Sequence, residues 1–243
     1  MKQYGKSRPA TAVISKTKML AFVKSFDWKA IRSALAQNAD VLGYRGPRGE
    51  NYLHVCCGVD IRKHRLSALD SIKTADLLID SGLDVNGEAF REGEWKATPL
   101  WFVIARSNNP QLAKHLLKRG ASPEYCLWAA AYNDDSAAIR LLAAAGATID
   151  PAGGETPLLF AVRWSRFAAA RTLLQCGADP NSRGEASKTA LHYMLKKRSD
   201  PRNVRMFLEH GARLDSSDRD GITVRSLLSR SRDARYRALL ENT

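Results

Sequence analysis

The chain has 243 residues, of which 44% are hydrophobic and 26% charged, and it carries a formal net charge of +13. This composition is typical of a globular protein and excludes a disordered, collagen-like or disulfide-rich chain. No apolar stretch approaches the ~20 residues that span a bilayer, and residues 1–18 are not followed by the apolar core of a secretory signal. Because the four cysteines form no disulfide pattern, we expect free thiols and a cytoplasmic location.

Positive charge is concentrated at both ends of the chain. Residues 1–65 carry a net +9, residues 66–187 a net −2 and residues 188–243 a net +6. Net charge governs long-range attraction to polyanions rather than the fold. Acidic proteins, nucleic acids and anionic membranes therefore all remain open as partners at this stage.

A short phrase recurs along the chain: two Leu-like residues, two or three others, then Gly or its equivalent and a small residue. It begins at Leu77, Leu116, Leu141, Leu173 and Phe207. Paired apolar residues complete the buried face of a helix, and Gly readily takes the left-handed conformation that closes one. Each copy therefore predicts the end of a helix.

A second phrase precedes each of these helix ends. It reads Thr-Pro-Leu at Thr98 and Thr156 and Thr-Ala-Leu-His at Thr189, with degenerate copies at Asn51 and Tyr125. Thr caps a helix start through its side-chain oxygen, and Pro is tolerated in the first turn. In four copies the second phrase and the Gly are 21 or 22 residues apart, which is room for two short helices and a turn.

This pattern resembles the ankyrin repeat, in which Thr-Pro-Leu-His, a helix pair, Leu-Leu and Gly-Ala-Asp recur with a period near 33. Thr156 and Thr189 are 33 residues apart. The resemblance covers about 225 residues and implies an all-α, ankyrin-type α-solenoid of about seven helix-turn-helix repeats. The units start near residues 17, 51, 98, 125, 156, 189 and 223. We expect residues 1–16 to form a flexible basic tail and residues 17–243 to form a single solenoid.

Two departures from the period predict long loops. One is an insertion around residues 60–71, between the helices of the unit that starts near 51. The other is a long finger over residues 87–97, which contains Trp95. Long loops in repeat proteins often lie on a binding face, although neutral drift explains them equally well.

The chain offers no sequence motif for catalysis: it has no phosphate-binding loop, no nucleophile elbow and no zinc-protease motif. His54 and His192 occupy the fourth position of the start phrase, where the family's histidine hydrogen-bonds its own turn. Cys56 and Cys57 stand where sibling units have alanines, which indicates small buried residues. No four-ligand zinc spacing occurs. We expect no enzymatic activity, no cofactor, no metal and no small-molecule substrate.

The resemblance implies a non-catalytic scaffold or adaptor for protein–protein interaction. Ankyrin-like stacks bind partners on a concave groove formed by the fingers and the ends of the first helices. In this chain the expected groove positions are basic with aromatics at the centre, and none is a carboxylate. Arg, Tyr and Trp are enriched at interface hot spots, so an acidic segment of a partner protein is the expected ligand. The expected partner-binding residues are Trp95, Arg106, Tyr132, Arg163, Trp164, Lys196 and Lys197.

Three alternatives remain open. For any single position, a solvated helix end is the simpler interpretation. A nucleic-acid-binding solenoid could contact phosphates through its basic ends and groove, but the negatively charged middle segment interrupts such a surface. Attachment to an anionic membrane lacks the amphipathic or lipidation signal that it requires, so we expect no membrane partner. We expect the chain by itself to be a monomer.

Overall fold

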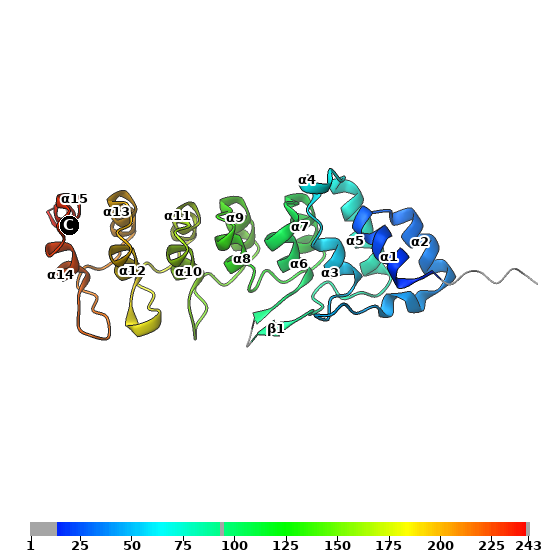
Figure 1. Ribbon diagram of the computed structural model, residues 1–243, viewed down its shortest axis with the longest axis horizontal. Coiled ribbons are helices and arrows are strands. Elements are labelled where there is room, and N and C mark those ends of the chain that lie inside the picture. The colour runs from blue at the N-terminus through cyan, green and yellow to red at the C-terminus, as the bar shows by residue number, and fades with distance from the viewer. Residues whose placement is uncertain (1–13, 93–94, 242–243) are drawn as a thin grey trace, which may run out of the picture. The chain divides into compact units, whose positions relative to one another are not determined.

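The structure is a computed structural model that describes residues 14–92 and 95–241. The regular secondary structure of the described residues is almost entirely helical and forms successive helix pairs joined by loops (Figure 1). The chain divides into two compact units, residues 1–121 and 122–243, and each is described by itself below. The prediction that residues 17–243 form one solenoid stays a prediction. Within the described residues, no helix is long and apolar enough to span a membrane.

The first unit contains three helix pairs with two irregular additions. Its helices are α1 (Lys16–Ser25), α2 (Trp28–Gln37), α3 (Tyr52–Cys57), α4 (Ile61–His64), α5 (Ala68–Asp80), α6 (Pro99–Phe102) and α7 (Pro110–Lys118), with a 3-10 turn η1 (Ala39–Gly43) and a π-helical turn η2 (Val103–Ser107). Strands β1 (Arg91–Glu92) and β2 (Trp95–Lys96) pair antiparallel. The pairs are α1 with α2, α3 with α5, and α6 with α7.

The second unit contains four helix pairs. Its helices are α8 (Leu127–Tyr132), α9 (Ser136–Ala144), α10 (Pro157–Arg163), α11 (Phe167–Gln175), α12 (Ala190–Lys196), α13 (Pro201–Glu209), α14 (Val224–Ser229) and α15 (Ala234–Arg237), with 3-10 turns η3 (Glu185–Ser187) and η4 (Ala238–Leu240). The loops that precede α10, α12 and α14 point to one side of the helices (Figure 1), which we call the finger side. The seven predicted unit starts each fall within two residues of a helix start.

Local chemistry explains where these helices begin and end. The hydroxyls of Thr98 and Thr156 each accept a hydrogen bond from a backbone N–H in the first turn, at 3.3 Å, and a proline follows each threonine. After α11, Gly177 has φ 95°, and the next residue donates its N–H back to the Leu173 carbonyl at 3.0 Å. This is the glycine-closed helix end that the repeated phrase predicts.

Small residues on the first helices allow neighbouring pairs to pack closely. Ala129, Ala130 and Ala131 of α8 are all buried, and α8 packs directly against α10. Large apolar residues such as Leu158 and Leu173 fill the space between first and second helices. Each pair has too little core to be stable alone, so stacking supplies the buried area. The predicted all-α ankyrin-type solenoid fold is confirmed.

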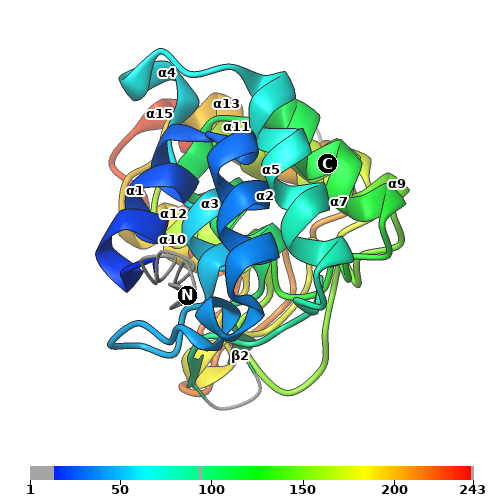
Figure 2. The same ribbon diagram turned by 90° about the vertical axis from the view of Figure 1, so that its right-hand side faces the viewer.

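The structure also contains both long loops. The insertion predicted around 60–71 includes α4, which projects beyond α3 and α5 (Figures 1 and 2). The finger predicted over 87–97 carries β1 and β2, with Arg91 opposite Lys96. Most of the tail predicted over 1–16 lies outside the described residues. At its end, Ser15 caps α1 and Lys16 is already helical.

Candidate functional site

The ends of the first helices in the second unit carry an exposed aromatic pair. Tyr132 is the last residue of α8, and Trp164 directly follows α10. Their rings meet edge to face with centroids 5.7 Å apart. Tyr132 is 48% exposed and Trp164 52% exposed, although large aromatic side chains normally gain stability by burial. Two such rings in contact at the surface are a feature that folding alone does not require.

Two further residues complete this aromatic cluster. Phe160, one turn before Trp164 on α10, lies 6.1 Å from the Trp164 ring and 6.4 Å from the Tyr132 ring, centroid to centroid. The guanidinium of Arg166 lies 5.5 Å from the centre of the Tyr132 ring, in cation–π range. Neither residue was predicted, because Phe160 lies three residues before and Arg166 two residues after the expected groove residues Arg163 and Trp164.

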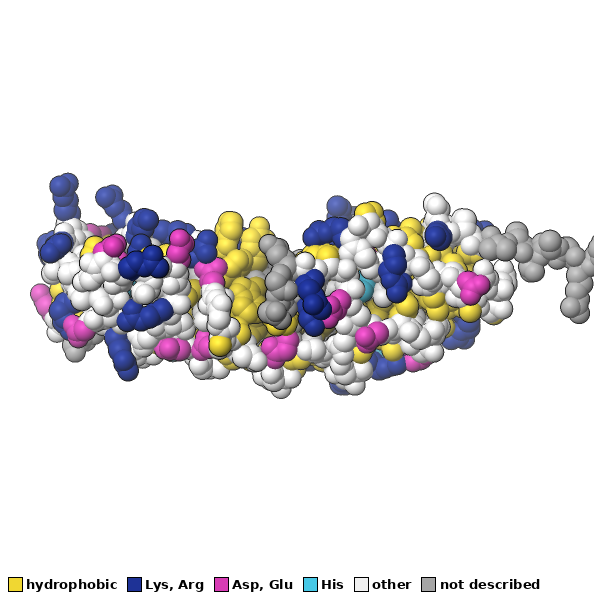
Figure 3. Space-filling model, turned by 90° about the horizontal axis from the view of Figure 1, so that it is seen from below, with side chains coloured by type: hydrophobic (Ala, Val, Ile, Leu, Met, Phe, Trp, Pro, Cys, Tyr) yellow, Lys and Arg dark blue, Asp and Glu magenta, His cyan; other side chains and the backbone are white. Residues whose placement is uncertain are grey.

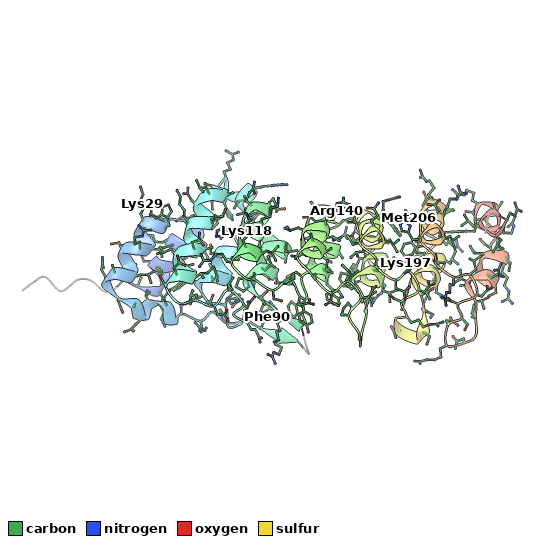
Figure 4. All side chains as sticks on the ribbon, turned by 180° about the vertical axis from the view of Figure 1, so that it is seen from behind. Lys29, Phe90, Lys118, Arg140, Lys197 and Met206 are labelled. Carbon is green, nitrogen blue, oxygen red and sulfur yellow. The ribbon has the colours of Figure 1, made fainter. Side chains whose placement is uncertain are left out.

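Lysines extend the cluster onto the next repeat. The ammonium group of Lys197, directly after α12, donates a hydrogen bond to the backbone carbonyl of Arg163. Lys196 is exposed beside it (Figure 4 labels Lys197). Contacts therefore run from α8 through α10 to α12, which brings together residues about 33 apart in sequence. We call this surface the Trp164 patch: Tyr132, Phe160, Arg163, Trp164, Arg166, Lys196 and Lys197.

One expected feature of the patch is modified by the structure. Arg163 forms an ion pair with Glu155, with N–O distances of 2.9 and 3.0 Å. This carboxylate belongs to the residue directly before the Thr156 cap, which is not one of the expected groove positions. The positive charge of Arg163 is therefore offset locally, and Lys196 and Lys197 supply the uncompensated charge.

A hollow of about 970 Å³ adjoins the lysine end of the patch, between the last two helix pairs. It is lined by Lys196, Arg230 and Arg232, and also by the carboxylates of Asp200 and Asp218. Seen from the finger side, hydrophobic side chains gather in the region of α8 and Lys and Arg side chains over the pairs that follow (Figure 3). This surface is mixed in charge rather than uniformly basic.

The two other predicted site residues belong to the first unit. Trp95 of β2 is half-buried, with its ring 5.2 Å from Phe90 and 5.1 Å from Trp101, centroid to centroid. Arg106 is exposed on η2, with its guanidinium 5.0 Å from the Phe102 ring centre and 5.7 Å from that of Trp101. Much of the Trp95 surface is therefore buried in packing at the base of the finger.

The buried histidines act in structure. In His192, Nδ1 accepts a hydrogen bond from the Thr189 backbone N–H at 3.2 Å, and Nε2 lies 3.0 Å from the Ile222 carbonyl oxygen. His54 makes the same pair of contacts, with the Asn51 N–H at 3.2 Å and the Gly87 carbonyl at 2.9 Å. Each ring thus fixes its own helix start and also bonds the finger of the following repeat. The second bond, 30 or 33 residues away, was not predicted.

Reactive or metal-binding chemistry is not apparent in the described part of the chain. No group of three or more His, Cys, Asp or Glu side chains there is arranged to hold a metal ion. The four cysteines are free, and Cys56, Cys57 and Cys126 are buried. Burial raises the pKa of the Cys126 thiol to about 12 and also raises that of Cys57, so neither is a thiolate nucleophile at neutral pH.

Comparison with known proteins identifies the repeat. The family model described as ankyrin repeats in three copies matches residues 100–184. Human inversin is 30% identical over 131 residues, which are 53% of this chain and 12% of inversin. An ankyrin repeat-containing protein of Treponema pallidum is 28% identical over 154 residues, which are 63% of this chain and 42% of that protein. The chain therefore matches less than half the length of these relatives.

Solved structures give the same result for the fold. The human ASB11 ankyrin repeat domain matches with a TM-score of 0.70 and 20% sequence identity, and the match covers 93% of this chain and 97% of that one. Identity this low carries information about the fold alone.

Proposed function

Since this chain is an ankyrin-repeat protein, we propose that it is a non-catalytic scaffold that binds a partner protein through the Trp164 patch. Ankyrin repeats generally mediate protein–protein interaction, and the patch lies at the ends of the first helices, where such stacks bind. The observation that carries the proposal is the exposure of Tyr132 and Trp164, which are in mutual contact yet each about half accessible to solvent. Trp and Tyr are enriched among the few hot-spot residues that dominate the binding energy of protein interfaces.

The surroundings of the aromatic pair favour an acidic segment as the ligand. Lys196 and Lys197 are exposed at one edge, and Arg166 lies against Tyr132 at another. Because Arg163 is already paired with Glu155, a partner's carboxylates would pair with the two lysines. Charges at the edge of an interface mainly accelerate encounter, whereas the desolvated aromatic centre slows dissociation. The patch is therefore suited to a short acidic stretch that carries an apolar residue.

The experiment is an affinity pulldown from native lysate with three forms of the chain, each with and without nuclease. The forms are the wild type, the double variant Lys196→Glu/Lys197→Glu and the matched control Arg140→Glu/Arg171→Glu. The control makes the same change in net charge at exposed positions on α9 and α11 of the same unit (Figure 4 labels Arg140).

The proposal expects a partner protein that survives nuclease treatment, is lost with the lysine double variant and is retained by the control. With the purified partner, the lysine variant should slow association most at low salt because exposed charges are screened at high salt. A partner retained equally by all three forms would refute the patch. If nuclease abolished recovery, nucleic acid would replace protein as the ligand.

A further inference from the structure

The insertion in the first unit adds a wall to a hollow beside it. Three residues separate α8 from α9, whereas ten, 58–67, separate α3 from α5. Four of these ten form α4, which becomes an additional wall. The hollow has a volume of about 900 Å³ and lies among α1, α3, α4, α6 and η2. We call it the α4 hollow; its lining includes Lys24, His54, Lys63, His64, Phe102 and Arg106.

The added wall is fixed in place by a long-range contact. One carboxylate oxygen of Asp60 accepts the backbone N–H groups of Arg62 and Lys63 at 2.9 and 3.0 Å, which caps α4. Its other oxygen accepts the side-chain amide of Asn108 at 2.8 Å, from the end of η2 in the next repeat. These donors, led by the Lys63 N–H, lower the pKa of Asp60. The insertion is thus tied to the neighbouring repeat, as a binding wall requires.

Three cations line this hollow, each from a different element: Lys24 from the end of α1, Lys63 from α4 and Arg106 from η2. Within the described residues, none of these three side chains pairs with a carboxylate within 4 Å.

The two carboxylates that line the hollow are already engaged. Asp60 accepts the three hydrogen bonds given above, and Glu50 accepts the backbone N–H of Arg48 at 3.0 Å. These hydrogen bonds come from neutral N–H groups and leave both carboxylates charged, so the three cations exceed the two carboxylates by one positive charge. An excess of positive charge in a concave site favours a ligand that brings its own negative charge.

Arg106 is held in position for such a ligand. Its guanidinium lies over the Phe102 and Trp101 rings, which restrain its long side chain, and its N–H groups bond no acceptor among the described residues. It projects from the π-helical turn η2, and turns of this type are frequent at functional sites. The fork of a restrained arginine matches the paired oxygens of a carboxylate or phosphate.

From this geometry we infer that the α4 hollow binds an anionic group, a carboxylate or a phosphate, presented by a protein partner. The inference deepens the proposed scaffold function and rests on it for the source of the anion. A volume of about 900 Å³ accommodates one or two peptide side chains. The anion would be an Asp or Glu side chain, or a phosphorylated residue, of the bound segment.

The test is an NMR titration of the ¹⁵N-labelled full chain with small anions, which needs no partner. The probes are inorganic phosphate, glutarate and, as an uncharged control, triethyl phosphate. We expect saturable shifts at the amides of Gly58 and Val59, which line the hollow. Saturation by glutarate identifies a carboxylate source, and saturation by phosphate alone identifies a phosphorylated residue.

Variants locate the effect. Arg106→Gln and, separately, Lys63→Gln should each raise the Kd for the anion at least 5-fold. Lys118→Gln, at an exposed lysine on α7, should change this Kd less than 2-fold. Lys63 is exposed, so its variant keeps the test valid if Arg106→Gln disturbs packing. The inference is overturned if no anion saturates by 50 mM, if triethyl phosphate gives the same shifts, or if all three variants bind alike. Trp164 does not line the α4 hollow, so Trp164→Ala should leave this titration unchanged, and failure here is distinguishable from failure of the Trp164 patch.

Discussion

The substitution His192→Phe tests how one buried ring couples consecutive repeats. The ring accepts the Thr189 N–H through Nδ1, so its proton lies on Nε2, which donates to the Ile222 carbonyl before α14. Phenylalanine keeps a planar ring at this buried position and removes both hydrogen bonds, together with the 2.9 Å contact between the Thr189 hydroxyl and Nδ1. The change therefore removes the polar coupling and keeps an aromatic ring in the core.

The magnitude follows from which groups are left without partners. Thr189 is 2% exposed, so leaving its backbone N–H without a partner should lower the free energy of unfolding by about 1–3 kcal/mol. Ile222 is 38% exposed, so its carbonyl can bond water at little cost. We expect a loss of about 2 kcal/mol in the free energy of unfolding.

The assay is urea unfolding followed by circular dichroism at 222 nm, with amide exchange in α14 as a local probe. The matched control is His210→Phe, since the His210 side chain is exposed and, among the described residues, bonds the Met206 carbonyl alone, at 2.8 Å. That variant should lose less than about 0.5 kcal/mol. Equal effects from the two variants, or unchanged exchange in α14 for His192→Phe, would refute the reasoning.

Three further predictions follow from single residues. Gly177→Val should cost about 2 kcal/mol in urea unfolding from backbone strain alone, since a Cβ there meets no atom within 4 Å; Gly177→Asn should cost less, and equal losses would contradict this. Burial lowers the pKa of His54, so the neutral ring contributes its full stabilisation of the fold above pH ~6.5, and this contribution declines as the pH falls. If His54→Gln leaves the pH dependence of the urea midpoint unchanged, this prediction is wrong. Cys176 alone should react with a thiol reagent in the native state, and Cys126 only after unfolding; stoichiometric zinc or a protected pair would exclude this.

Helix positions were predictable because their signals are local. A Thr cap, a Pro in the first turn and a Gly at the helix end each act within about four residues, so Thr156 and Gly177 bound one helix pair unambiguously. The presence of the insertion was predictable from the extra residues between two repeat phrases. Its structure was not predictable, because the position of α4 depends on the contact between Asp60 and Asn108, which are 48 residues apart.

The candidate site was predictable in outline only. Repeat geometry correctly placed Tyr132 beside Trp164 and Lys197 beside Arg163. The pairing of Arg163 with Glu155 was missed, although the residue before the cap and the helix end, eight positions on, face each other in this turn.

The central claim is that the Trp164 patch holds a partner protein, and isothermal titration of that purified partner into the wild type and into Trp164→Ala tests it most directly. Trp164 is 52% exposed, so its truncation should leave the chain folded, and the lost ring contacts with Tyr132 and Phe160 should lower the unfolding midpoint only slightly. The account predicts a loss of about 2 kcal/mol or more, which is roughly a 30-fold rise in Kd. A Kd within about 2-fold of wild type for the folded variant would contradict the claim.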